Sequence, residues 1–142
     1  MNFNSQICTM RVQSERLLAL GLKKKTADMC INISHESELV YSFSYSEALS
    51  LYHNYGLDRL TNTDLLLPAW SLHRLIEMMP SFIDIGEHSY MFSIIQGKLF
   101  SYGSDIVGNA FLYGKGSVYD SAIYTIEWLI KEGYFSKEYL EE

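Results

Sequence analysis

The sequence has little cysteine, little proline and no long run of apolar residues. It contains two cysteines, two prolines and nine glycines among 142 residues. The low proline and glycine content excludes collagen-like and low-complexity chains. Cys8 and Cys30 form no C-x-x-C pair and have no histidine at zinc-site spacing, so they predict two buried free thiols rather than a disulfide framework or a metal site.

Features of membrane or secreted proteins are also scarce. No apolar stretch approaches the ~18 residues that a membrane-spanning helix needs, and the run Leu65–Leu67 stops at Pro68. The first six residues lack the basic and apolar regions of a secretion signal. We therefore expect a cytoplasmic protein that has no membrane partner.

Positive charge is the third scarcity. Eleven Lys and Arg residues stand against seventeen Asp and Glu, which gives a formal net charge of −6. Nucleic acids require a basic surface, so we expect no nucleic-acid partner. The one basic run, Lys23–Lys25, follows an expected helix end that favours cations. The acidic residues are spread along the chain, so mimicry of DNA by an acidic surface is a third-ranked alternative.

Apolar and aromatic residues, by contrast, are plentiful. Hydrophobic residues make up 48% of the chain, and its rings comprise 11 Tyr, 7 Phe and 2 Trp. A chain of this length suits one domain, because domains of roughly 100–150 residues are the commonest. The rings can serve the core or a contact surface, since Tyr and Trp are enriched at protein interfaces.

The first half of the chain predicts two helices and a hairpin. Thr9 can cap a helix over residues 10–20, which Gly21 ends. Alternating apolar residues predict a strand over 29–33 and a returning strand over 39–43. Residues 46–60 are a further helix candidate, with Ser46 as its cap.

The second half predicts two helices that flank a set of strands. Pro68 and Pro80 bound an expected helix, since proline suits a first helical position and stops a helix interior. Strands are expected over 89–95 and 98–102, with another over 106–113. In the first of them Tyr90, Phe92 and Ile94 point one way, and Met91, Ser93 and Ile95 point the other.

The last expected helix has signals at both of its ends. Ser117 and Asp120 form a capping box that opens this helix, and Gly133 ends it. We expect residues 1–8 and 136–142 to fray.

These elements predict one α+β domain spanning residues 1–142. Its antiparallel sheet is built from hairpins and carries three helices, or four if residues 46–60 form one. The element order is then α-β-β-(α)-α-β-β-(β)-α.

No complete catalytic motif is present. His73 and Glu77 are four residues apart on an expected helix, a spacing that suits an acid/base pair but is more typical of a solvated pair. Lys115 lies in a Gly-Lys-Gly-Ser run that departs twice from the phosphate-binding loop pattern. We therefore expect no cofactor, no metal and no catalytic residues, and keep these three side chains as polar-site candidates.

The tryptophans suggest an interaction surface. On a helix over 68–80, Trp70 lies roughly 160° from the centre of the apolar arc and close to Arg74. Tyr124 and Trp128 lie off the apolar arc of the last helix. These four side chains are the interaction-surface candidates, and the alternative is that a second layer of structure covers them. If these side chains form a contact with a partner or a second copy, we expect the double change of Trp70 and Trp128 to Ala to abolish that contact and to have a smaller effect on stability.

Three segments together resemble the small phage- and prophage-associated hypothetical proteins of gut Bacteroidetes: residues 14–22 followed by 26–29, residues 67–80 and residues 122–134. The Pro-Ala-Trp-Ser-Leu sequence beginning at Pro68 is the most specific part, and residues 45–62 match least, as an insertion would. The resemblance implies a mobile-element origin and a bacterial cytoplasm, with no activity or catalytic residues to transfer.

The sequence therefore favours a non-enzymatic protein-interaction module of phage or prophage origin. Its partner is an unidentified protein or a second copy of the chain. The alternative from another class is a small hydrolase or nucleotide-handling enzyme whose site gathers distant residues such as His73, Glu77 and Lys115.

Overall fold

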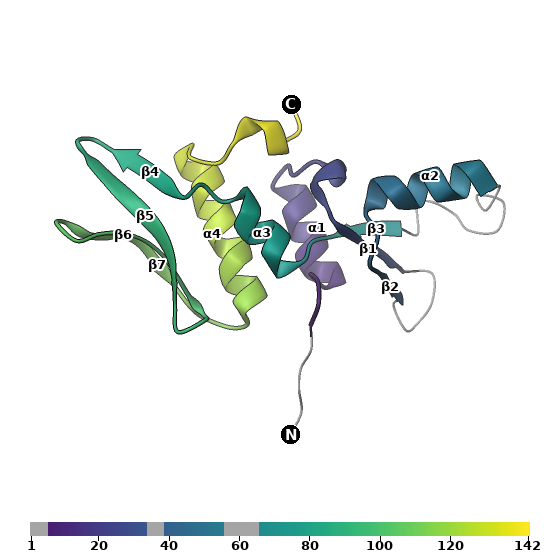
Figure 1. The fold of residues 1–142 in the computed structure, drawn as a ribbon, viewed down its shortest axis with the longest axis horizontal. Coiled ribbons are helices and arrows are strands. Elements are labelled where there is room, and N and C mark those ends of the chain that lie inside the picture. The colour runs from purple at the N-terminus through teal and green to yellow at the C-terminus, as the bar shows by residue number, and fades with distance from the viewer. Residues whose placement is uncertain (1–5, 34–38, 56–65) are drawn as a thin grey trace, which may run out of the picture. The chain divides into compact units, whose positions relative to one another are not determined.

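The computed structural model describes residues 6–33, 39–55 and 66–142 (Figure 1). Within these ranges it contains four α-helices and two antiparallel sheets, of three and four strands, which confirms the α+β class. The chain divides into two compact units, Met1–Arg74 with Tyr139–Glu142, and Leu75–Glu138. That residues 1–142 form a single domain stays a prediction.

The first unit is built on a three-stranded antiparallel sheet. Its central strand, β1 (Met29–Asn32), pairs with β2 (Leu39–Tyr41) on one side and with β3 (Leu66–Ala69) on the other. The predicted hairpin is thus confirmed. The unit also contains α1 (Arg11–Ala19), a 3-10 turn at Lys24–Thr26 and α2 (Tyr45–Tyr55).

Both faces of β1 are buried, which explains its run of apolar residues. Met29 and Ile31 pack with Cys8 in one cluster. Cys30 packs on the opposite face with Ala48 of α2 in another cluster. A strand that is covered on both sides needs apolar residues at successive positions rather than at alternate ones.

The ends of α1 differ in how well local sequence predicts them. Gly21 has φ +101° and allows a Schellman closure in which the Leu22 N–H donates to the Leu17 carbonyl at 3.2 Å, as predicted. The prediction that Thr9 caps this helix is wrong. Met10 occupies the cap position, and its N–H donates to the Gln13 side chain at 2.9 Å.

Residues 68–71 do not form the expected start of a helix. Pro68 lies in β3 opposite Cys30, and α3 runs only over Leu72–Met78. Because β3 is an edge strand, the missing N–H of Pro68 costs no ladder hydrogen bond. The prediction of a helix from Pro68 is therefore wrong in its first turn.

The helix predicted over 46–60 is present as α2, which starts earlier. Ser44 rather than Ser46 caps it, since the Ser44 hydroxyl accepts from the Glu47 N–H at 3.1 Å. The expected end of this helix lies outside the described residues, as does part of the insertion suggested at 45–62.

The second unit is a four-stranded antiparallel sheet with α4 on one face (Figure 1). Its strands follow chain order: β4 (Phe82–Ile85), β5 (His88–Ile95), β6 (Leu99–Ser104) and β7 (Gly108–Tyr113). Three of these strands are predicted from sequence, and β4 is not. The long helix α4 (Val118–Glu132) follows.

Both ends of α4 confirm the sequence prediction. The Ser117 hydroxyl accepts from the Asp120 N–H at 3.1 Å, and the Asp120 carboxylate accepts from the Ser117 N–H at 3.2 Å. Gly133 adopts φ +82° after the last turn.

The fraying expected at residues 136–142 is not found. Lys137–Tyr139 form a 3-10 turn, and Leu140 forms an isolated antiparallel bridge with Leu22. The Glu141 N–H donates to the Gly21 carbonyl at 2.7 Å. These bonds satisfy backbone groups at the end of α1 and hold the tail in the first unit. At the other terminus Cys8 is buried, while residues 1–5 lie outside the described ranges.

Candidate interaction surface

Trp70 is a core residue, so its assignment to an interaction surface is wrong. Its side chain has 0% exposure. The indole Nε1 donates to the Thr26 hydroxyl at 2.9 Å, and the backbone N–H donates to the Thr9 hydroxyl at 3.1 Å. Trp70 follows β3 rather than lying on a helix, so the helical period used to place it does not apply.

Arg74 is also engaged within the first unit. Its Nε donates to the Thr26 carbonyl at 2.8 Å, and its guanidinium lies 5.6 Å from the centre of the Tyr139 ring. The side chain remains partly exposed. These contacts give Arg74 a structural role in joining α3 to the C-terminal tail.

Trp128 belongs to a cluster of rings between α4 and the sheet. Its ring centre lies 4.7 Å from that of Phe111 and 6.0 Å from that of Tyr102, and the residue is half-buried. Tyr124 stacks on Tyr113 at 4.0 Å and keeps 40% exposure at the edge of the cluster. The side of α4 that helical periodicity indicates to be polar therefore contacts the sheet. Tyr124 and Trp128 on that side are largely packing residues.

The polar-site candidates lie on the surface and do not form a site in the described residues. His73 and Glu77 are exposed on α3, and Lys115 is exposed in the turn before α4. A surface hollow of about 370 Å³ is lined, among the described residues, by four residues of α2, namely Ser46, Glu47, Ser50 and Leu51. In the part of the chain that the structure describes, no group of three or more His, Cys, Asp or Glu side chains could hold a metal ion.

The two cysteines are buried free thiols, as predicted. Burial raises the pKa of Cys8 to about 11, with a further contribution from Asp28. Burial likewise raises the pKa of Cys30 to about 11, and the neighbouring Cys8 adds to the shift. At neutral pH both thiols are protonated, and a protonated thiol is a poor nucleophile.

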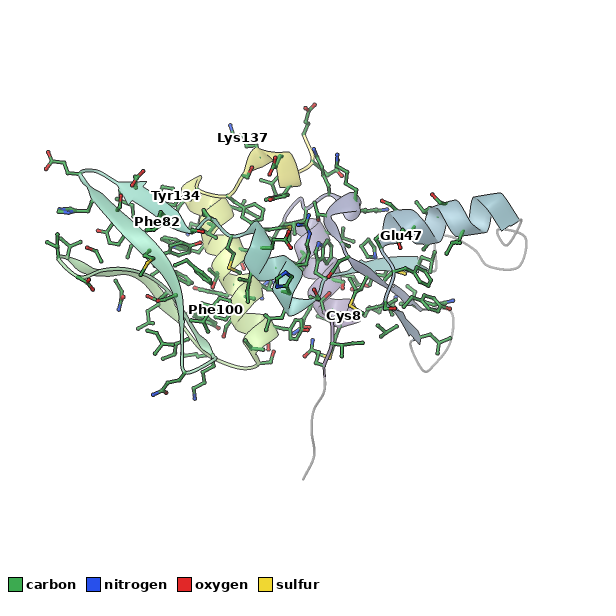
Figure 2. All side chains as sticks on the ribbon, in the orientation of Figure 1. Cys8, Glu47, Phe82, Phe100, Tyr134 and Lys137 are labelled. Atoms are coloured by element: carbon green, nitrogen blue, oxygen red, sulfur yellow. The ribbon has the colours of Figure 1, made fainter. Side chains whose placement is uncertain are left out.

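The two faces of the four-stranded sheet have different surroundings. One face carries Phe92, Phe100, Tyr102 and Phe111, whose rings contact one another or Trp128 of α4. Phe100 and Tyr102 are fully buried there, and Figure 2 labels Phe100 between the sheet and α4. Successive strand residues point to opposite faces, so the residues between them form the other face.

This other face, which we call the open face, exposes large apolar side chains. They come from three strands: Phe82 is 61% exposed, Met91 55%, Leu112 50% and Ile95 42%. The strand register places Phe82 opposite Met91 and Leu112 opposite Ser101, so these residues share one side of the sheet.

The side chains in the middle of the open face are small and uncharged. The Ser101 hydroxyl donates to the Asn109 side-chain oxygen at 3.1 Å. A Cβ at Gly103 would lie 2.5 Å from that same oxygen, so glycine leaves room for the amide over β6. Among the strand residues of this face, all of them described, Asp84 is the one charged side chain, and it accepts a hydrogen bond from Ser89.

The apolar surface extends to one end of the sheet. Ile106 is 83% exposed and Val107 is 47% exposed in the turn between β6 and β7. The β4–β5 turn lies at the same end (Figure 1).

The sequence carries a signal for the open face. It predicts the alternation along β5, which the structure confirms, and both sets of alternating residues contain large apolar side chains. A sheet with one solvated face ordinarily shows polar residues at every second position. Met91 and Ile95 depart from that pattern. Because they lie on a strand, the helical periodicity that selects the interaction-surface candidates cannot identify them.

No protein-family model, curated protein or solved structure matches this chain. Among the described residues, no helix is both long enough and apolar enough to cross a membrane. The function is therefore inferred from the surface chemistry of the described residues.

Proposed function

We propose that this chain is a non-enzymatic interaction module that binds a protein partner through the open face. The observation that carries the proposal is the exposure of Phe82, Met91 and Leu112 on the side of the sheet opposite α4. Several large apolar side chains exposed on one side of a sheet are typical of binding sites in soluble proteins.

The size of the exposed apolar surface supports this proposal. A large apolar side chain has roughly 200 Å² of surface, so four that are about half exposed contribute roughly 400 Å². At about 25 cal/mol per Å², covering this area yields roughly 10 kcal/mol before the costs of association. Those costs are about 4–15 kcal/mol, so a partner must cover most of the face to bind stably.

The chemistry of the face favours protein over nucleic acid as the partner. Phosphate groups require Lys or Arg, and the strand residues of the open face, all described, include neither. A surface that exposes Phe82 and Met91 and carries little charge shares two features of protein interfaces, enrichment in Phe and Met and depletion of charged residues.

The proposed origin is a phage or prophage, and the proposed compartment is the bacterial cytoplasm. The resemblance of residues 14–22 with 26–29, 67–80 and 122–134 to phage-associated proteins supports both. The enzyme alternative has no comparable support, because exposed His73, Glu77 and Lys115 are not gathered in a cavity of the described chain. No observation favours DNA mimicry.

Site-specific photo-crosslinking in cells tests the proposed function. Met91 is replaced by the photo-reactive residue benzoylphenylalanine, and Val12, which is 75% exposed on α1, provides a matched control position. We expect a discrete protein adduct from position 91 and none from position 12. A second substitution on the same face, Leu112→Glu, should remove the adduct.

The proposal would be overturned by the absence of an adduct at position 91, or by an identical adduct pattern from positions 91 and 12. Persistence of the position-91 adduct in the Leu112→Glu variant would show that the open face is not the binding surface.

A further inference from the structure

We infer that the partner on the open face is a second copy of this chain, packed face to face about a two-fold axis. This inference rests on the proposed function, since it names the partner of the same surface.

The charge distribution supports a self-contact. In a two-fold interface the same surface lies on both sides, so charges near its centre meet like charges of the other copy. The chain carries a net charge of −6, yet the one charged strand residue of the open face is Asp84. Asp84 lies on the edge strand β4, beside its hydrogen-bond partner Ser89. The open face is thus the kind of surface on which two acidic copies can meet without close repulsion.

A partner that presents charged groups, positive or negative, fits the open face less well than an uncharged apolar partner. Placing a charged partner group against Met91 or Leu112 would remove that group from water with no opposite charge nearby, which is costly. A neutral apolar surface is the complementary choice, and the open face is itself such a surface.

Large exposed side chains of the face lie on both of its edge strands. The central part of the face has small residues, Ser93 on β5 with Ser101 and Gly103 on β6. Large side chains stand on either side, with Phe82 on β4 and Leu112 on β7. Two sheets that pack face to face lie about 10 Å apart with strands turned by about 30°. In that arrangement the outer strands of one copy lie over the outer strands of the other, so the exposed side chains of Phe82 and Leu112 contact those of the second copy.

The available area fits a reversible dimer. The strands are four to eight residues long, and four such strands about 4.8 Å apart cover roughly 400 Å² in projection. Side-chain relief increases the accessible area, so two faces together bury roughly 800–1,200 Å². This is the low end of the range for specific association, which predicts a concentration-dependent equilibrium rather than an obligate dimer.

Sedimentation velocity over a range of protein concentrations tests the inference on the full chain. The weight-average mass should rise with concentration from the 16.4 kDa of one chain toward twice that value. Met91→Glu and Leu112→Glu each place a charge on the face and should raise the concentration needed for dimerisation at least tenfold. Val12→Glu, at a more exposed position on α1, is the control and should leave the equilibrium unchanged.

Thermal melts accompany these measurements to show that each variant is folded. If a glutamate variant melts early, Phe82→Ser gives a second test at the most exposed large apolar strand residue of the face. A wild-type mass that stays at one chain throughout would overturn the inference, as would equal dissociation by Val12→Glu.

The crosslinking adduct separates this inference from the proposed function. If the dimer forms, the position-91 adduct contains two copies of this chain. A monomeric chain whose position-91 adduct contains a different protein contradicts the dimer and leaves the proposed function standing. A monomeric chain that gives no adduct contradicts both.

Discussion

Trp70 links segments of the first unit that are far apart in the sequence. Its carbonyl accepts from the Thr9 N–H at 2.9 Å, and its own N–H donates to the Thr9 hydroxyl. The Thr26 hydroxyl accepts from the indole and donates to the Lys23 carbonyl at 2.6 Å. Every polar group of this buried network thus has a partner, which makes the indole a structural residue with two functions, packing and hydrogen bonding.

We therefore expect substitutions of Trp70 to act on stability. Trp70→Phe loses one buried hydrogen bond and some packing volume, and should lower the free energy of unfolding by about 1–2 kcal/mol. Trp70→Ala leaves a large cavity and should lower it by about 3–5 kcal/mol. Urea unfolding followed by circular dichroism measures both values. Val12→Ala is the control and should change stability by less than about 0.5 kcal/mol.

The sequence predicts that changing Trp70 and Trp128 to Ala affects a contact more than stability. For Trp70 the structure leads to the opposite expectation. A Trp70→Ala chain with unchanged stability and altered mass would contradict the buried network and restore the contact role of the indole.

The buried thiols make stability depend on alkaline pH. The pKa of Cys8 and that of Cys30 are each about 11 in the folded chain, against an ordinary value of 9.0. Between these pH values the unfolded chain releases protons that the folded chain retains. The contribution of the two thiols to the free energy of unfolding is therefore complete below pH 9 and is lost as pH rises toward 11.

Urea midpoints measured between pH 8 and pH 11 test this prediction. The midpoint should fall above pH 9, and the Cys8→Ala/Cys30→Ala variant should show a shallower fall. Part of the fall should remain in that variant, because burial also raises the pKa of Tyr102 above its ordinary value of 10.0. Equal slopes in the two proteins would show that the thiols are not the source.

Elements with local signals at their ends are the ones that sequence predicts well. Ser117, Asp120 and Gly133 specify α4 at both ends because capping bonds join residues three or four apart. The Gln96–Gly97 turn likewise fixes the β5–β6 hairpin, with φ values of 54° and 72°. Such bonds form within a short segment, so a single sequence contains the information.

Elements defined by distant partners are predicted poorly. Pro68 is typical of a helix start, yet it lies in β3 because residues 66–69 pair with β1, almost 40 positions earlier in the chain. Strand pairing of this kind overrides local preference. A helix over residues 68–71 would put Trp70 on its polar face. The incorrect helix prediction therefore assigned a core residue to the candidate surface.

The candidate surface could be predicted only in part. Periodicity gives the two faces of β5, and it places Met91 and Ile95 on the same one. Which face α4 covers depends on tertiary packing, here on contacts of Trp128 with Phe111 and Tyr102. Sequence therefore places Met91 and Ile95 together on one face of β5, but it predicts neither the exposure of that face nor the contribution of Phe82 from β4.

At the scale of the whole molecule, the chain leaves the first unit and returns to it. The first unit contains the segment that ends at Arg74 and also the tail from Tyr139 onward. These two residues, which bound the inserted second unit, are in contact through the Arg74 guanidinium and the Tyr139 ring. The tail also bonds to Gly21 and Lys23. Residues 139–142 thus complete the first unit.

Removal of residues 139–142 should destabilise the first unit more than the second. The shortened chain loses two backbone hydrogen bonds of about 1 kcal/mol each, and one cation–ring contact of about 0.5–1 kcal/mol. We expect a loss of about 2–3 kcal/mol in the first unit. One tryptophan lies in each unit, so Trp128→Phe leaves Trp70 to report on the first unit, and Trp70→Phe leaves Trp128 to report on the second.

Urea unfolding followed by fluorescence, with and without the tail in each background, measures the two effects separately. The midpoint reported by Trp70 should shift clearly to lower urea, and the midpoint reported by Trp128 should shift less. Deletion of Glu142 alone is the matched control, because it keeps the bonds of Tyr139 and Glu141. Equal shifts at both tryptophans would show that the tail stabilises the two units as one cooperative structure rather than the first unit in particular.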